Sequence, residues 1–202
     1  MKVLNLYAGI GGNRKLWTDV EVTAVEYDPK IASIYKDFFP QDTMIVGDAH
    51  AYLLEHFKKF DFIWASPPCP THSRICKVFT NGKATNPIKY PDMKLYEEII
   101  LLKHYFDGKF CIENVVAYYD PLIPAQEIDN HWFWSNFHIP NFPDGCREHY
   151  GGYETLVKTK GFDISKYSGI NKIKTLRNCV NSHLAKHIFD SQQGQLHQEL
   201  FT

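Results

Sequence analysis

Short apolar runs alternate with segments of helical periodicity along the first half of this 202-residue chain. The apolar runs, which are partly β-branched, are Val3–Tyr7, Val22–Val25, Thr43–Val46, Phe60–Ala65 and Phe110–Ile112. The helical segments are Asn13–Trp17, Pro29–Phe39, Ala49–Phe57 and Asp92–Phe106. Such alternation is typical of a mostly parallel sheet that helices cover on both faces. The sequence therefore predicts an α/β fold.

The composition places the chain among folded proteins and excludes several other classes. Hydrophobic residues make up 44% and charged residues 22% of the chain, which is typical of a globular domain with a sizeable core. No apolar run approaches the roughly 20 residues of a membrane span, and no secretory signal precedes the first run. The five cysteines lack disulfide-framework spacing, which indicates free thiols in a reducing compartment. We therefore expect a soluble, cytoplasmic protein without membrane contact.

A polar and basic loop is predicted from Pro67 to Pro91. The net charge of the chain is −1, but residues 66–95 hold five Lys or Arg against one acid, Asp92. A local basic excess of this kind can meet the phosphates of a nucleic acid, and a solvated loop is the alternative. We expect Arg74 and Lys77 of this loop to contact nucleic acid.

A glycine-rich turn, Ala8–Gly12, follows the first predicted strand. Glycines permit positive φ and let a ligand approach the backbone closely. Glu26 ends the second strand 15 residues after Gly11, near the spacing of about 20 residues for a ribose-binding acid in nucleotide folds. The dinucleotide pattern G-x-G-x-x-G is incomplete, because Arg14 stands at its last position. A solvated strand end is the alternative interpretation of Glu26.

Cys69 lies four residues after the fourth apolar run, at the carboxyl edge of the predicted sheet, where α/β folds bind ligands. Pro67 and Pro68 stiffen the backbone before it. His72 and Arg74 supply nearby positive charge that would favour a nucleophilic thiolate. Most cysteines are inert, buried residues, but this one stands in a polar, proline-rich loop. We therefore expect Cys69 to be reactive.

Five stretches, in a fixed order over roughly residues 3–136, resemble the DNA cytosine-5 methyltransferase family. They are Leu6–Gly12, Glu26–Asp28, Gly47–Asp48, Ser66–Cys69 and Glu113–Val115, with a fainter match at Asn178–Val180. The resemblance implies a Rossmann-like class I S-adenosylmethionine-dependent methyltransferase fold with a mostly parallel sheet and a small target-recognition insertion. It also implies a compact enzyme of the kind found in phages and restriction–modification systems.

The cofactor implied by the resemblance is S-adenosylmethionine. Tyr7, where the family commonly has Phe, would pack beside the adenine, although an ordinary core aromatic is an equal alternative. Glu26 would hold the ribose hydroxyls, and Asp48 would face the adenine amino group while also serving as a helix cap. The other residues that the resemblance assigns to the cofactor are Gly9, Gly11, Gly12, Tyr27, Ser66, Pro67, Asn178 and Val180.

The catalytic residues implied by the resemblance are Cys69, Glu113, Pro68 and His131. Cys69 would attack C6 of cytosine, while the Glu113 carboxyl group would hydrogen-bond N3 and the exocyclic amine as positive charge develops there. His131 and Asp129 occupy the positions of a family arginine pair, so a protonated His131 would replace the arginine that contacts the ring carbonyl. Arg147 is a second candidate for that contact.

The expected substrate is double-stranded DNA, whose target cytosine must be flipped out of the helix. We expect three parts: a catalytic domain (1–136), a reduced target-recognition region (137–175) and a C-terminal helical segment (176–202) that packs back on the catalytic domain. The small middle region predicts a short recognition sequence or help from a dimer. The residues predicted to bind nucleic acid are Ser73, Arg74, Lys77, Val115, Arg147, Lys158 and Lys160.

Alternative functions remain open at this point. The same site would serve a transfer RNA cytosine-5 methyltransferase, and the missing arginine pair permits a non-catalytic nucleic-acid-binding relative. Cys111 lies near the position of the nucleophile in another type of RNA methyltransferase, but its place within a strand predicts burial. Cys146 and His149 have a C-x-x-H spacing without a matching second pair. We therefore expect no metal.

Overall fold

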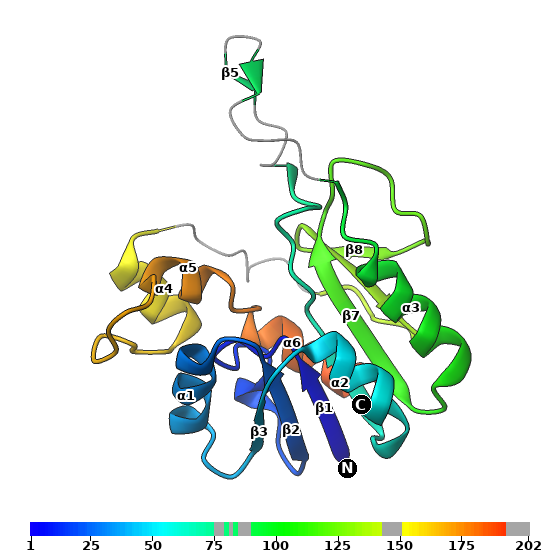
Figure 1. Cartoon of the computed structure of the whole chain (residues 1–202), viewed down its shortest axis with the longest axis horizontal. Coiled ribbons are helices and arrows are strands. Elements are labelled where there is room, and N and C mark those ends of the chain that lie inside the picture. The colour runs from blue at the N-terminus through cyan, green and yellow to red at the C-terminus, as the bar shows by residue number, and fades with distance from the viewer. Residues whose placement is uncertain (75–78, 81–82, 85–89, 143–150, 193–202) are drawn as a thin grey trace, which may run out of the picture.

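A seven-stranded sheet forms the centre of the computed structural model, which describes residues 1–74, 79–80, 83–84, 90–142 and 151–192. The strand order is β3-β2-β1-β4-β7-β9-β8 (Figure 1). Five strands are parallel, while β9 runs antiparallel to both β7 and β8. The strands are β1 (Lys2–Leu6), β2 (Glu21–Glu26), β3 (Thr43–Val46), β4 (Phe62–Ala65), β7 (Lys109–Val115), β8 (Gln126–Ile128) and β9 (His131–Ser135). The predicted α/β fold with a mostly parallel sheet is confirmed.

Helices cover both faces of this sheet, and each face has its own apolar cluster. Leu4 and Leu6 of β1 point to the face covered by α2 and α3, whereas Val3 points to the face covered by α1, α4, α5 and α6. In Figure 1, α2 and α6 lie on opposite sides of β1. The helices are α1 (Pro29–Phe38), α2 (Ala49–His56), α3 (Lys94–Tyr105), α4 (Tyr153–Lys160), α5 (Lys172–Arg177) and α6 (Ser182–Gln192), with 3-10 turns η1 (Arg14–Leu16) and η2 (Phe57–Lys59).

Side-chain caps fix where several helices begin. Asp28 accepts a hydrogen bond from the Lys30 N–H at the start of α1. Asp48 accepts hydrogen bonds from the His50 and Ala51 N–H groups at the start of α2. Asn181 accepts from two N–H groups at the start of α6. This cap explains why the helix of the predicted C-terminal segment, 176–202, begins at Ser182.

The segment Asn13–Trp17, predicted as a helix, forms only the 3-10 turn η1. Arg14 is buried, and its guanidinium donates to both carboxylate oxygens of Asp42 at 2.7 and 3.0 Å. A further N–H of Arg14 donates to the Trp17 carbonyl at 2.7 Å. This buried ion pair ties the chain after the glycine turn to the segment before β3.

The last third of the chain contains more regular structure than its sequence indicates. Helix α4 lies within residues 137–175, where the apolar periodicity is weak, and α5 begins in this region and ends at Arg177. Their buried residues Leu156 and Leu176 belong to the apolar cluster on the α1 face of the sheet. Helix α6 packs back on η1, where the rings of Trp17 and Phe189 stack with centroids 5.0 Å apart.

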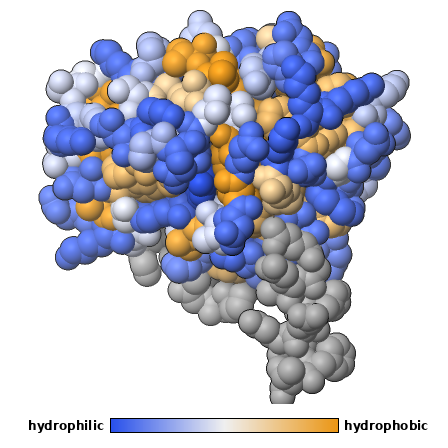
Figure 2. Space-filling model, turned by 90° about the horizontal axis from the view of Figure 1, so that it is seen from below, coloured by the Kyte–Doolittle hydropathy of each residue, from blue (hydrophilic) through white to orange (hydrophobic). Residues whose placement is uncertain are grey.

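The loop after β4 carries a short antiparallel pair, β5 (Phe79–Thr80) and β6 (Lys83–Ala84). This pair projects away from the sheet beyond its carboxyl edge (Figure 1). Seen from the opposite end, the surface is mostly hydrophilic with apolar residues interspersed (Figure 2). Among the described helices, none has the length and apolar character required to cross a membrane.

Gly12 lies against the segment that joins α5 to α6. A Cβ at this position would stand 2.7 Å from the Cβ of Cys179 and 2.9 Å from the carbonyl oxygen of Val180. Neither neighbour is the flexible end of a long side chain, so neither can move aside easily. The glycine therefore permits the turn after β1 to touch the C-terminal segment directly.

Gly12→Ala should lower the free energy of unfolding by about 1–3 kcal/mol, because the added methyl group overpacks this contact. Urea unfolding followed by circular dichroism measures the change. Gly47→Ala is the matched control, since a Cβ at Gly47 meets nothing within 4 Å. The control should be neutral or stabilising by about 0.5 kcal/mol. Equal effects of the two substitutions would contradict the close approach at Gly12.

Candidate functional site

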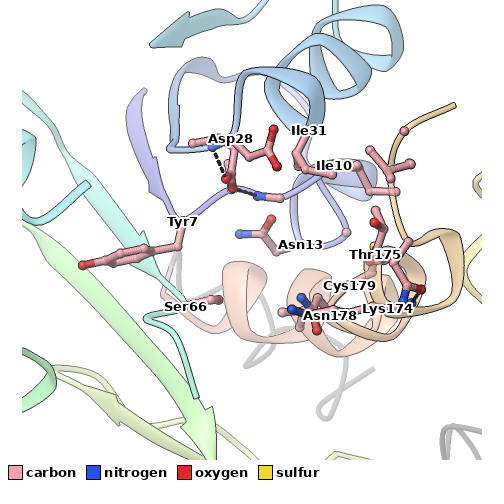
Figure 3. Close-up of a pocket in the computed structure, with 18 residues that line it drawn as sticks. Tyr7, Ile10, Asn13, Asp28, Ile31, Ser66, Lys174, Thr175, Asn178 and Cys179 are labelled. Carbon is pink, nitrogen blue, oxygen red and sulfur yellow. Dashed lines mark hydrogen bonds between the residues drawn. The ribbon is translucent and has the colours of Figure 1, made fainter. Parts of the chain in front are cut away.

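A cavity of about 440 Å³ opens at the carboxyl ends of β1 and β2 (Figure 3). Its lining comes from the glycine turn after β1, from the end of β2 with the start of α1, and from residues 169–180. The lining residues are Tyr7, Ala8, Gly9, Ile10, Gly12, Asn13, Glu26, Asp28, Ile31, Ser66, Gly169, Ile170, Asn171, Lys174, Thr175, Asn178, Cys179 and Val180.

Glu26 joins the turn after β1 to the end of β2. One of its carboxylate oxygens accepts the Gly9 N–H at 2.9 Å, and the other accepts the Asp28 N–H at 2.9 Å. Gly9 adopts a φ of 55° and Gly11 a φ of 89°, which is the left-handed region that favours glycine. The carboxylate is thus held at the cavity wall, and each oxygen keeps acceptor capacity for a ligand hydroxyl.

Seven of the predicted cofactor residues line this cavity, namely Tyr7, Gly9, Gly12, Glu26, Ser66, Asn178 and Val180. The other four do not line it. Gly11 packs against Phe39 and Tyr35, Tyr27 is 78% exposed, Pro67 is buried and Asp48 caps α2. Hydrogen bonds from the Ala51 and His50 N–H groups hold the pKa of Asp48 below its usual range, so this cap is a carboxylate at neutral pH.

The ring of Tyr7 extends away from the other labelled residues of the cavity (Figure 3). Its hydroxyl donates to Glu98 Oε1 at 2.5 Å, and His50 Nδ1 lies 2.9 Å from the same oxygen. Glu98 is fully buried on α3. Burial and the Glu98 carboxylate raise the pKa of Tyr7, and the hydrogen bond to Glu98 raises the pKa of His50. A polar network therefore fixes a tyrosine that also has a positive φ of 56°.

Cys69 and Glu113 lie at the same edge of the sheet, because they follow the paired residues Ala65 and Ile112 of the neighbouring strands β4 and β7. Cys69 is partly exposed, whereas Glu113 is 8% exposed. The buried side chain of Asn114 donates to the Pro67 carbonyl at 3.0 Å. This bond joins the stretch around Glu113 to the stretch that precedes Cys69.

The chain after Cys69 turns back and packs on the chain after β7. The Cys69 carbonyl accepts from the His72 and Ser73 N–H groups, at 2.9 and 3.0 Å. Ser73 forms a β-bridge with Ala117, and Arg74 Nε donates to the Ala117 carbonyl at 3.3 Å. The loop that carries Cys69 is thus held on both sides.

His72 does not supply the positive charge that the sequence suggested for Cys69. It is buried, and its Nδ1 lies 2.5 Å from the hydroxyl of Tyr119. Burial lowers the pKa of His72, so the imidazole is neutral at pH 7. Cys111, by contrast, is buried as expected, and burial raises the pKa of its thiol.

His131 directs one ring nitrogen at Glu113. The turn before it has φ of 48° at Asp129 and 64° at Asn130, which are the backbone angles of a type I′ hairpin between β8 and β9. His131 Nδ1 donates to the Asp129 carbonyl at 3.0 Å, which fixes the tautomer. Its Nε2 then lies 3.5 Å from Glu113 Oε1.

The residues predicted to bind nucleic acid have different surroundings. Arg74 and Lys158 are exposed, while Ser73 and Val115 are half-buried. Lys160 is buried, and its ammonium donates to the Cys179 carbonyl at 2.5 Å, so its observed role is to hold the C-terminal segment. Lys77 and Arg147 lie outside the described residues, as do Cys146 and His149. Elsewhere in the described chain, no group of three or more His, Cys, Asp or Glu is arranged to hold a metal ion.

Comparisons with known proteins find sequences related to this chain. Residues 1–120 match the model of the family described as C-5 cytosine-specific DNA methylase. A tRNA (cytosine(38)-C(5))-methyltransferase of Spodoptera frugiperda is 32% identical over 97 residues, which are 44% of this chain and 29% of that protein.

Two solved structures resemble parts of the chain. A mutant form of Spodoptera frugiperda DNMT2 is 28% identical, with a TM-score of 0.40 over 56% of this chain and 35% of that one. A putative DNA modification methyltransferase encoded within an Escherichia coli prophage is 21% identical, with a TM-score of 0.40 over 59% of this chain and 33% of that one. The chain thus spans about a third of the length of these relatives.

The Glu98–His50 pair predicts a pH-dependent stability. Because the folded-state pKa of His50 is raised above 6.5, its contribution is complete below pH 6.5 and is lost as the pH rises through the folded-state value. The difference in unfolding free energy between the wild type and His50→Asn should shrink above pH 6.5, by at most about 1.4 kcal/mol per pH unit. Urea titrations from pH 6 to 9 measure it.

His104→Asn is the control, because this histidine is exposed on α3, outside the network. It should not reproduce the trend. A constant difference in unfolding free energy between the wild type and His50→Asn from pH 6 to 9 would contradict this prediction. It would show that Glu98 does not stabilise a protonated His50.

Proposed function

Because this chain belongs to the C-5 cytosine-specific DNA methylase family, we propose that it methylates C5 of cytosine in DNA through a covalent cysteine adduct. The observation that most supports the proposal is the hydrogen bond from Asn114 to the Pro67 carbonyl. It joins the loop that carries Cys69 to strand β7, which carries Glu113. A thiol and a carboxyl group held at one sheet edge are the groups that activation of a cytosine ring requires.

S-adenosylmethionine is the cofactor, and the residues of the cavity suit it. Gly9 and Gly12 both line the cavity, so the turn presents backbone without side chains to a ligand there. Glu26 offers a carboxylate fixed by two N–H groups to ribose hydroxyls. Tyr7 would lie beside the adenine, while Asn178 and Val180 would close the other side of the cavity. Asp48 caps α2 and does not line the cavity, so we assign it no cofactor contact. When bound, the cofactor supplies an electrophilic methyl group for C5.

Cys69 would act first, by addition of its thiolate to C6 of the flipped cytosine. Glu113 would hydrogen-bond N3 and the exocyclic amine, which stabilises the ring as C5 becomes nucleophilic. Once C5 carries the methyl group, transfer of the C5 proton to a base and departure of the Cys69 thiolate from C6 would restore the aromatic ring. Pro68 would fix the direction of the thiol.

We assign His131 a role through Glu113. Its Nδ1 proton is already donated to the Asp129 carbonyl, so Nε2 is the nitrogen that faces the site. At 3.5 Å from Glu113 Oε1, this nitrogen can exchange a proton with the carboxyl group or hold it in place. Contact with the ring carbonyl, the role suggested for His131 by the sequence, would use the same nitrogen.

A transfer RNA cytosine is the second candidate substrate, because the relative that is 32% identical over 97 residues acts on tRNA. Arg74 and Lys158 are exposed and would meet the phosphates of either nucleic acid, and Ser73 and Val115 are partly exposed. Transfer of a labelled methyl group separates the two candidates. We expect duplex DNA to be labelled, and labelling of tRNA alone would replace DNA as the proposed substrate.

Cys69→Ala should abolish methyl transfer while S-adenosylmethionine still binds, since the thiol acts after binding. The wild type should form a covalent adduct with DNA that contains 5-fluorocytosine, and the variant should form none. Cys111→Ala is the matched control and should still form the adduct, because Cys111 is buried within β7. An adduct formed by Cys69→Ala, or DNA binding without any wild-type adduct, would overturn the mechanism.

Asn114→Ala should slow adduct formation about 10- to 100-fold, because the loop that positions Cys69 loses its bond to Asn114. The affinity for S-adenosylmethionine, measured by calorimetry, should change less than about twofold, since Asn114 does not line the cavity. Asn136→Ala is the control. Asn136 also holds β7, through the Phe110 N–H and the Gly108 carbonyl, but at the opposite edge of the sheet. An equal loss of rate in both variants would refute the positioning role of Asn114.

A further inference from the structure

One wall of the cofactor cavity comes from a region that the sequence assigned to target recognition. Gly169, Asn171, Lys174 and Thr175 all lie within residues 137–175, and all line the cavity. In Figure 3, Lys174 and Thr175 lie across the cavity from Asp28. This wall therefore faces the cofactor, and its side chains can contact the cofactor.

Hydrogen bonds hold this wall against α1 and η1. Lys30 donates to the Gly169 carbonyl at 3.3 Å, and the Tyr167 hydroxyl donates to Asp37 at 2.7 Å. Lys15 donates to the carbonyls of residues 160 and 161, at 2.8 Å each. The wall is therefore a fixed part of the cavity in this conformation.

Lys174 is the one cationic side chain among the described residues that line the cavity. Its backbone N–H donates to Asn171, which starts α5, but no hydrogen bond or ion pair joins its ammonium to any described residue. The neighbouring Lys172 differs, because its ammonium donates to the Ser165 carbonyl. Lys15 and Lys30 likewise use their ammonium groups within the fold. Lys174 is thus left to meet a ligand.

The opposite wall is acidic, since Glu26 and Asp28 both line it. Two N–H groups of the glycine turn are already engaged: that of Gly9 with Glu26, and that of Gly11 with the Ala8 carbonyl. The 3-10 turn η1 has only three residues, so it provides no helix dipole for an anion. A negative group in this cavity is consequently repelled on one side and attracted on the other.

S-adenosylmethionine carries one anionic group, the α-carboxylate of its methionine part. We propose that Lys174 binds this carboxylate and thereby orients the methionine part along the wall formed by α5. Asn171 and Thr175 provide neutral polar groups beside it. The inference rests on the cofactor assignment of the proposed function and not on the nature of the nucleic acid.

Calorimetry with two ligands tests the inference without any nucleic acid. S-adenosylmethionine is compared with its decarboxylated derivative, which keeps the adenosine, the sulfonium and the amine. Lys174→Met should bind S-adenosylmethionine about fivefold to tenfold more weakly, as expected for a partly exposed charge-assisted contact. Binding of the decarboxylated ligand should be unchanged or stronger, because a like charge has been removed. Lys174→Arg should keep the wild-type preference for the carboxylate.

Two controls separate this inference from the cofactor assignment. Lys103→Met removes an exposed charge on α3 that does not line the cavity, and it should change neither affinity. Glu26→Gln should weaken the binding of both ligands, because both contain the ribose. If Lys174→Met weakens both ligands equally or leaves S-adenosylmethionine unaffected, the role of Lys174 is wrong and the cofactor assignment stands. If the wild type binds neither ligand, both the role of Lys174 and the cofactor assignment are wrong.

Discussion

The hydrogen bond from the Asn114 side chain to the Pro67 carbonyl is the interaction on which the site depends. Parallel neighbours such as β4 and β7 end at one edge of a sheet, but this does not fix how the loop after β4 faces the end of β7. The buried Asn114 amide on β7 donates to the loop after β4 and supplies that constraint. Leaving the carbonyl without a partner would be costly in the interior, so the bond also restricts the conformations of the Cys69 loop.

The cavity depends on a different kind of contact, which is close packing between segments far apart in the chain. The turn after β1 touches the residues between α5 and α6, and Gly12 has no room for a Cβ. Polar groups in the same neighbourhood are tightly paired: Lys160 with the Cys179 carbonyl, and Arg14 with Asp42. The first and last parts of the chain thus build one cavity together.

The sheet could be predicted from the sequence because its strands are short apolar runs between capped helices, and the glycine turn and Glu26 could be placed at its edge. The wall formed by Lys174 and Thr175 could not, because weak periodicity between Phe137 and Lys174 conceals α4 and α5. The burial of two basic residue types also escaped prediction. Lysine usually lies at the surface, yet the ammonium of Lys160 donates to a carbonyl in the interior. His72 is neutral because burial lowers its pKa. Such outcomes depend on tertiary contacts, which local patterns do not contain.

The contact between Gly12 and Cys179 also has a consequence for biosynthesis. A ribosome makes the glycine turn early, but the residues that complete the cavity leave the exit tunnel more than 150 residues later. A nascent chain that already has β1, β2 and Glu26 would still lack one side of its binding site. Affinity for the methyl donor would therefore arise late, when α5 docks, and the donor would then help to retain the newly docked segment.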